Sequence, residues 1–393
     1  MATDFTVDRD TVKYVLNSSG DIASVAIDTP AIEYNTDGSF KGLLVEPAAT
    51  NVCLQSEDIT TTWASSNATL TANDTTAPDG NTTADKLNDD NGGGTGLVNI
   101  SQSVTFSTST TYTFGCFIKS DGLTFAHLRV TNLTTPSNGG SFFNLSTGTV
   151  DLNDSGYTGS IQDYGNGWYR CSITFTTGAT DTTGEVRIYP ASSASFAGLT
   201  VDRDGTSSIF VWGAQVEASP IATSYIPTTT ASVTRVKDDI TQTSASSLIG
   251  QTEGTLYVEV DWRLTSGVNQ YLLMASDGTF DNRVLIYNTS GGNLNMLAEA
   301  GDDIKTNQGE SSSSYSDIQK FAFAYADADF ELYRNGSSIS SDTVGSLAAL
   351  TTLTNVNLGQ SPTPSFYANM WIRAVALFTR RLSDAEAQAL TTL

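Results

Sequence analysis

The sequence predicts an all-β protein built from two antiparallel β-sandwiches, preceded by a short N-terminal β segment. Charged residues make up only 16% of the 393 residues, whereas Ser, Thr, Asn and Gly are abundant. Runs rich in Val, Ile, Phe and Tyr recur at short spacing, with turn-forming residues between them. One convincing helix occurs, at the C-terminal end. Short strands joined by polar turns explain this composition better than long amphipathic helices do.

The first segment, residues 1–48, contains two hairpin-like pairs. In residues 13–27 a β-rich stretch meets Asn-Ser-Ser-Gly, and in residues 31–47 another meets Asn-Thr-Asp-Gly. This piece is too small to hold a core by itself. We therefore expect it to be a docking segment, which packs on the next domain or on a partner subunit.

Residues 49–230 predict a jelly-roll sandwich, because strand follows strand with Gly- and Asn-rich turns. In the run TYTFGCFIK, alternation places Phe114, Cys116 and Ile118 on one side of a strand. Buried positions are expected for the three cysteines and for two of the tryptophans, namely Cys53, Cys116, Cys171, Trp63 and Trp212. The stretch around Pro220 and Pro227 predicts a linker.

Residues 231–393 predict a second sandwich, with strands in GTLYVEVDW, QYLLMAS, NRVLIYN, FAFAYAD, FELYRNG and MWIRAVALF. The final helix begins after Ser383, which can cap it, and Glu386 completes a capping box. Leu382, just before the cap, is placed to pack onto Ala387 as a hydrophobic staple.

Net charge and hydropathy argue against several classes of partner. Lys plus Arg number 19 and Asp plus Glu number 42, which gives a net charge of −23. Such an acidic chain repels phosphate backbones and anionic headgroups, so neither nucleic acid nor membrane is an expected partner. No apolar run approaches the ~20 residues that span a bilayer, and the first residues lack a signal-peptide core. We expect synthesis in the cytoplasm.

Two family resemblances cover nearly the whole chain. Residues 42–87, YGNGWYRCSITF and the stretch from Val211 to Arg235 together resemble a carbohydrate-binding, jelly-roll module of tailed-phage virion proteins, and the match runs from about residue 20 to 235. The remainder, with Tyr333-Arg334-Asn335-Gly336 and Leu382-Ser383, resembles the concanavalin-A-like, laminin-G-type sandwich. Both resemblances together imply a virion component, such as a tail or head fibre or a decoration protein, that binds surface glycan.

Catalytic constellations are scarce in the sequence. The single histidine, His127, lies mid-strand, and no G-x-S-x-G turn or phosphate-binding loop occurs. Glycoside hydrolysis needs only two carboxylates, and Glu259 with Asp261 comes closest to the E-x-D-x-x-E pattern of concanavalin-A-like glucanases. The third carboxylate is replaced by Leu264. We therefore expect no enzyme and no catalytic residue, with surface charges on a strand as the simpler interpretation of this pair.

Calcium is common in both resembled families and needs several oxygen ligands. The candidates are Asp89, Asp90 and Asn91; Asp302 and Asp303; Asp327 and Asp329; and, from distant loops, Asp85 with Glu217. None has the spacing of a calcium-binding loop, so hydrated surface acid is the alternative. We expect no cofactor apart from an optional structural calcium.

Sugar binding needs aromatic faces and planar polar groups on a sheet surface. If their strands share one sheet, the residues opposite the core side form a polar and aromatic patch: His127, Arg129, Arg170, Arg187 and Tyr189. These are the expected glycan-binding residues. Cover of this face by the N-terminal segment or by a neighbouring subunit is an equally weighted alternative.

The function predicted from the sequence is that of a phage virion protein that recognises host-surface glycan without cleaving it. Expected partners are other capsid or tail proteins and the glycan, and a homo-oligomer, for example a trimer, is expected within the virion. A purely structural cement protein without ligand is the alternative, and a polysaccharide depolymerase is a weaker one.

Overall fold

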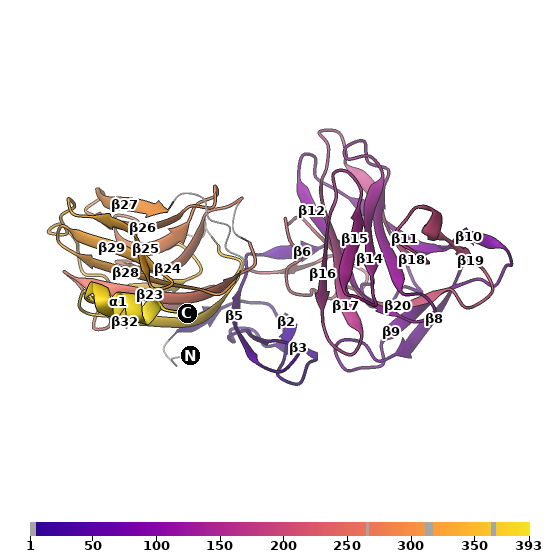
Figure 1. Cartoon of the computed structure of the whole chain (residues 1–393), viewed down its shortest axis with the longest axis horizontal. Coiled ribbons are helices and arrows are strands. Elements are labelled where there is room, and N and C mark those ends of the chain that lie inside the picture. Colours follow the sequence, from indigo (N-terminus) through magenta and orange to yellow (C-terminus); the bar gives the residue numbers. More distant parts are fainter. Residues whose placement is uncertain (1–4, 265–266, 311–316, 363–366) are drawn as a thin grey trace.

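The computed structural model describes residues 5–264, 267–310, 317–362 and 367–393. Two β-sandwiches lie side by side, with N-terminal strands between them (Figure 1). The predicted all-β class and the two antiparallel sandwiches are confirmed. No helix in these ranges is long and apolar enough to cross a membrane.

The first sandwich consists of two six-stranded sheets. Sheet I has the order β15 (Thr149–Asn153), β14 (Gly139–Asn144), β13 (Phe125–Thr131), β18 (Thr183–Ala191), β11 (Asn99–Thr105) and β7 (Ala64–Ser66). Sheet II has the order β16 (Thr158–Asp163), β17 (Trp168–Thr176), β12 (Thr111–Ser120), β20 (Ser208–Glu217), β9 (Ala84–Asp89) and β8 (Ala68–Thr75). Between them lies an apolar core that contains Leu128 and Ile188 from sheet I and Phe114 and Cys116 from sheet II. Short pairs β10–β19 (Thr95–Leu97, Thr200–Asp202) and β6–β21 (Ala49–Asn51, Val233–Arg235), with the 3-10 turn Ala197–Leu199, complete this half.

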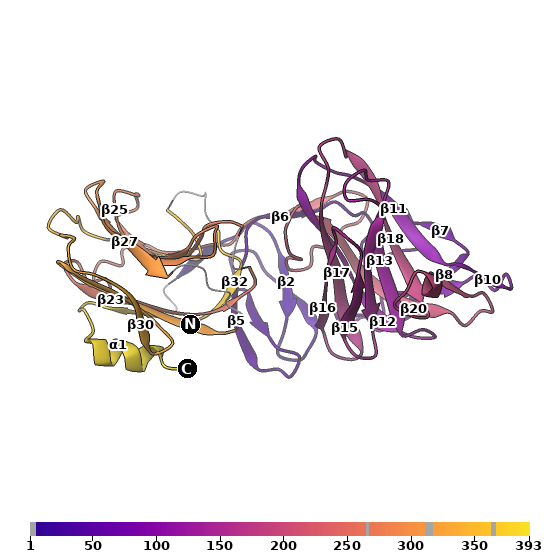
Figure 2. The same ribbon diagram turned by 45° about the horizontal axis from the view of Figure 1, so that its top comes forward.

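The second sandwich consists of two seven-stranded sheets. Sheet III has the order β1 (Thr6–Asp8), β22 (Asp239–Gln242), β31 (Asn355–Leu358), β24 (Gln270–Ser276), β25 (Asn282–Asn288), β26 (Leu294–Ala300) and β27 (Ile304–Glu310). Sheet IV has the order β30 (Ser337–Asp342), β29 (Asp329–Arg334), β28 (Gln319–Ala326), β23 (Gly254–Trp262), β32 (Met370–Phe378), β5 (Phe40–Val45) and β4 (Ile32–Tyr34). Helix α1 (Asp384–Thr391) covers the outer face of sheet IV (Figure 2).

The helix start is confirmed as predicted. Ser383 is the N-cap, and the capping box with Glu386 is present in both directions. Leu382 and Ala387 belong to one buried apolar cluster with Tyr257, which fixes the helix on the sheet. The expected core positions of the cysteines and of Trp63 and Trp212 are confirmed as well, since all five side chains are buried.

Strands of the N-terminal segment pair with both sheets of the second sandwich. β1 pairs with β22 in sheet III, and β5 pairs with β32 in sheet IV. The two expected hairpins form, one as β2 (Lys13–Leu16) with β3 (Ile22–Val25) and the other as β4 with β5. Leu16 and Ile22 of the first hairpin pack with Phe117 and Trp168 of the first sandwich. The domain boundaries expected at residues 48 and 230 stay predictions. The strand pairing nevertheless joins residues 1–48 to the second sandwich, which lies beyond both boundaries in the sequence.

The stretch after the first sandwich, expected as a linker, is bound along its length rather than free. Tyr225 and Ile226 are buried. The Asn51 amide donates to the Ile226 carbonyl at 2.8 Å, and the Tyr225 hydroxyl lies 2.7 Å from the Ser56 hydroxyl. Its end, Val233–Arg235, pairs with β6, and before that both backbone and side-chain hydrogen bonds hold the stretch in place.

A buried cluster of charges, which we call the junction cluster, joins the three parts of the chain. Its first carboxylate, Glu46 at the end of β5, faces Lys13 at 3.1 Å, Arg235 at 3.5 Å and Arg263 in direct contact. The Ser224 backbone N–H also donates to Glu46 at 2.8 Å. Glu46, Lys13 and Arg235 have side chains at most 1% exposed, so these contacts are shielded from water.

The second carboxylate of the junction cluster is Asp238. Lys13 lies 2.6 Å from it and Arg9 lies 2.9 Å away. The Glu46 backbone N–H donates to Asp238 at 2.9 Å. Four buried or nearly buried cations therefore share two carboxylates, and the cluster connects the N-terminal segment with the strands of the second sandwich and the stretch that follows the first.

Candidate functional site

The outer face of sheet I carries the residues expected to bind glycan, in two cross-strand rows. Leu128 and Ile188 point into the core, so their strand neighbours point outward, as predicted. The arginine row, in spatial order, is Gly140, Arg129, Arg187, Ser101 and Ala64. The aromatic row is Phe142, His127 and Tyr189. Strand register thus brings four of the five expected residues together.

The aromatic row is buried rather than exposed. His127 is 0% exposed and Tyr189 is 2% exposed. The His127 ring centroid lies 4.1 Å from that of Phe142 and 6.3 Å from that of Phe196, whose loop covers the row. Burial and the charge of Arg129 lower the pKa of His127 to about 3, so the ring is neutral at physiological pH. The expectation that His127 and Tyr189 are available to a sugar is therefore wrong for this conformation.

The arginine row remains accessible. Arg129 is part-buried, and its guanidinium carbon lies 5.7 Å from the centre of the Phe196 ring. Arg187 is held by Glu185, with Nη2 2.5 Å from the carboxylate, and its Nη1 lies 3.4 Å from the Tyr189 hydroxyl. Burial opposes ionisation of Glu185, but hydrogen bonds from Ser101 and Arg187 outweigh it and lower its pKa.

Small residues flank the two arginines. Gly140 stands directly opposite Arg129, and Ser101 stands directly opposite Arg187. A Cβ atom at Gly140 would lie 1.8 Å from the Leu128 carbonyl oxygen, so no larger residue fits there without a backbone shift. Within the row, therefore, no long side chain stands beside either arginine on its outer flank.

Arg170 does not belong to this face, which corrects the expected site. It lies on β17 in sheet II, opposite Phe117, because the chain switches sheets between β13 and β17. Its Nη1 donates to the Thr223 carbonyl at 2.6 Å, and its guanidinium lies 5.4 Å from the Phe117 ring centre. The side chain is buried towards the junction between the sandwiches, where it has a structural contact.

The carboxylate pair on β23 lies on the outer face of sheet IV. Glu259 accepts a hydrogen bond from Arg373 at 2.9 Å and lies 3.4 Å from the Tyr257 hydroxyl. Burial raises the pKa of Asp261, and Lys41 and Arg373 partly offset this. One carboxylate is thus paired with an arginine while the pKa of the other is raised by burial, which alone does not make an acid and nucleophile pair.

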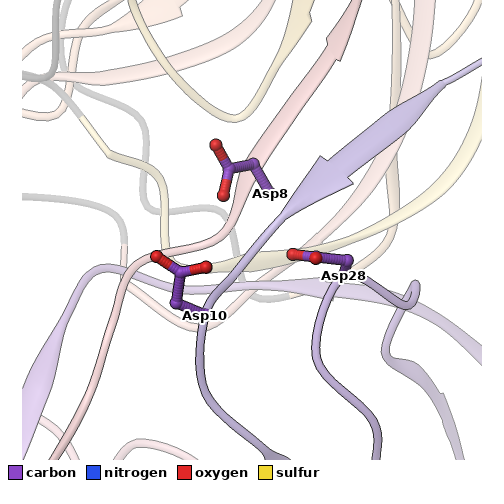
Figure 3. Close-up of side chains that lie close together, drawn as sticks. All are labelled: Asp8, Asp10 and Asp28. Carbon is purple, nitrogen blue, oxygen red and sulfur yellow. The ribbon is translucent and has the colours of Figure 1, made fainter.

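The calcium candidates do not assemble into a site. Most of them instead accept hydrogen bonds or pair with cations of the chain: Asp85, Asp89, Asp90, Glu217, Asp303, Asp327 and Asp329. Within the described ranges, the group of three carboxylates that could share an ion is a different one, Asp8, Asp10 and Asp28, whose oxygens lie within 4.8 Å of one another (Figure 3). Exposed acidic groups of this kind are common without an ion, so the group supports no assignment.

Sequence reasoning missed three residues that shape the candidate site. Glu185 lies two residues before Arg187 and therefore on the same face of the strand, and this spacing could have identified it. Phe142 could have been placed on the outer face by alternation in the run GSFFN. Phe196 lies in an irregular Ser-rich loop, and no periodicity in the sequence shows that this loop folds over His127.

Comparison with known proteins gives no family assignment. No family model matches the chain, and no curated protein matches it. Among similar solved structures, CBM40 of the Ruminococcus gnavus IT-sialidase has 20% identity and a TM-score of 0.33, over 37% of this chain and 86% of that one. The binding domain of Botulinum Neurotoxin DC in complex with SialylT has 12% identity and a TM-score of 0.32, over 39% of each chain. Scores this low support no conclusion about ligand or reaction.

Proposed function

We propose that the protein is a virion component of a tailed phage, a fibre or decoration protein, that binds a host-surface glycan on the outer face of sheet I without cleaving it. The observation that carries this proposal is the arginine row, in which Arg129 and Arg187 stand directly opposite one another between small residues. The phrases between residues 20 and 235 that resemble phage virion modules support the place in the virion.

A steric block tests the face independently of charge. Ala64 is exposed at the end of the arginine row, and Ser65 is exposed on the same short strand but points to the opposite side. We expect Ala64→Trp to abolish binding to a glycan array and to host cells, while Ser65→Trp binds like the wild type. Equal binding by both variants would move the ligand away from this face.

The absence of cleavage is tested on the same glycan. Glu259 is committed to Arg373, and Leu264 stands where the third carboxylate of the glucanase pattern would be. We therefore expect no new reducing ends after incubation with host polysaccharide. Turnover that disappears in Glu259→Gln or Asp261→Asn would establish a depolymerase instead.

A cement role between virion subunits is the second candidate, and one observation favours it. β5 pairs with β32 only at Met370 to Ile372, so in the described ranges the rest of β32 borders no strand on that side. An open strand edge can extend its sheet with a strand from a neighbour. Incorporation of the protein into particles combined with no binding to any host glycan would favour this role.

A further inference from the structure

We infer that the ligand of the arginine row is a glycan that carries a carboxylate, with Arg129 as its main anchor; this inference rests on the proposed function. The first reason is the charge pairing of the chain. Most of the 19 basic residues lie within 4 Å of a described carboxylate. Arg129 has no such partner, although the chain holds 42 acidic residues.

The cations that share this property differ from Arg129 in chemistry or position. Lys41, Lys119 and Lys320 carry a compact ammonium group rather than a planar fork, and the ammonium group of Lys320 donates to the Thr392 carbonyl. Arg170 is buried against Thr223. Arg129 alone presents a planar guanidinium on an outer sheet face, which is the geometry that pairs with a carboxylate through two parallel hydrogen bonds.

The donors of Arg129 are partly shielded from water and need an acceptor. Its Nε is buried and has no hydrogen-bond partner. Two carboxylates border the row, but both have partners: Glu185 binds Arg187, and Asp154 accepts from the Gly140 backbone N–H at 2.8 Å. An incoming carboxylate that contacts the outer nitrogens of this guanidinium would therefore meet no carboxylate of the chain already bound there.

A neutral sugar would find little to bind on this face. Sugar rings without charge gain much of their affinity by stacking on exposed aromatic rings. Here Phe142, His127 and Tyr189 are buried, and Phe196 is the ring of this group that is substantially exposed, at 52%. Charge therefore has to supply the affinity that stacking does not.

The experiment uses the full chain and an array of carboxylated, sulfated, phosphorylated and neutral glycans. The best carboxylated member is compared with the same glycan after reduction of its carboxyl groups to alcohols. We expect roughly a 10- to 100-fold loss of affinity on reduction, and a similar loss for Arg129→Gln. Arg129→Lys should recover only part of it, because lysine keeps the charge without the planar fork. Arg380→Gln, an equal charge change on the exposed surface of the second sandwich, is the matched control.

A variant that is expected to gain affinity gives the more specific test. Glu185→Gln removes the carboxylate that occupies Arg187, so it should strengthen binding of the carboxylated glycan several-fold and leave the reduced one unchanged. Equal binding of native and reduced glycan, with no effect of Arg129→Gln, would overturn the inference, as would a preference for sulfated or phosphorylated members. If glycan binding were still lost in Ala64→Trp, the proposed function would stand although the inference about the carboxylate had failed. No binding to any member would overturn both.

Discussion

The junction cluster makes the stability of the chain sensitive to a single neutral substitution, Glu46→Gln. Glutamine keeps the size of the side chain and can still accept the hydrogen bond from the Ser224 backbone at 2.8 Å. It removes one of the two negative charges that face Lys13, Arg9, Arg235 and the Arg263 guanidinium. Four cations would then share the single carboxylate of Asp238.

The size of the effect follows from burial. Removal of one partner from a buried ion pair typically costs about 3–5 kcal/mol, because the remaining charge is left without compensation. Glu46 is 0% exposed and has three cationic neighbours, so the upper half of that range is expected. A domain is stable by only about 5–15 kcal/mol in total, so the loss should be easy to observe.

Urea unfolding followed by tryptophan fluorescence measures this loss. With a slope of about 3 kcal/mol per molar, the midpoint of the transition that reports the second sandwich should fall by roughly 1.3–1.7 M. The exposed pair of Lys305 with Asp303 supplies the control, and Asp303→Asn should leave the midpoint nearly unchanged. A midpoint for Glu46→Gln within the error of the wild type would refute the argument from uncompensated charge.

Acid titration tests the sign of the same effect. Burial alone would raise the pKa of Glu46, but Lys13, Arg235 and Arg263 outweigh it and hold the pKa well below its usual range. A carboxyl whose pKa is lower in the folded than in the unfolded chain stabilises the fold above its unfolded pKa, about 4.3. This stabilisation is lost as the pH falls towards the folded pKa. The stability difference between the wild type and Glu46→Gln should therefore be full at pH 7 and shrink below about pH 4.

Two further predictions concern the core and the helix. Burial raises the pKa of the Cys53, Cys116 and Cys171 thiols, so a thiol reagent should label none of them in the native protein and all three in urea; labelling of the native protein would show that the first sandwich opens. Ser383→Ala removes the capping box of α1 and should lower stability by about 1 kcal/mol, measured by urea unfolding, with Ser337→Ala on β30 as a control that should change little.

The strands and the helix could be predicted from the sequence because the information that specifies them is local. Alternation in β12 placed Phe114 and Cys116 in the core, and Ser383 with Glu386 marked the helix start. The outer face of sheet I was also predictable, since Leu128 and Val130 of β13 point inward and leave His127 and Arg129 outside. Period-2 patterns fix which side of a strand a residue takes.

The exposure of these residues was not predictable in the same way. Alternation does not show what covers an outer face, and Phe196 of an irregular loop buries His127. Alternation also does not show which sheet a strand joins, so Arg170 was assigned to the wrong one. The junction cluster brings together Lys13 and Asp238, which are 225 residues apart, and only the tertiary structure shows this contact.

Because the N-terminal segment belongs to the second sandwich, its proposed docking role needs a different test from truncation. Deletion of residues 1–48 would remove β1, β4 and β5 and with them strand partners in sheets III and IV. It would also remove Glu46 and Lys13, and so leave Asp238, Arg235 and Arg263 with unpaired charge in the interior. Failure of such a truncated chain to join particles would report a damaged fold. Substitution of exposed residues of the segment, such as Ile27 at 52% exposure, leaves these contacts intact, so loss of assembly in that variant would report docking.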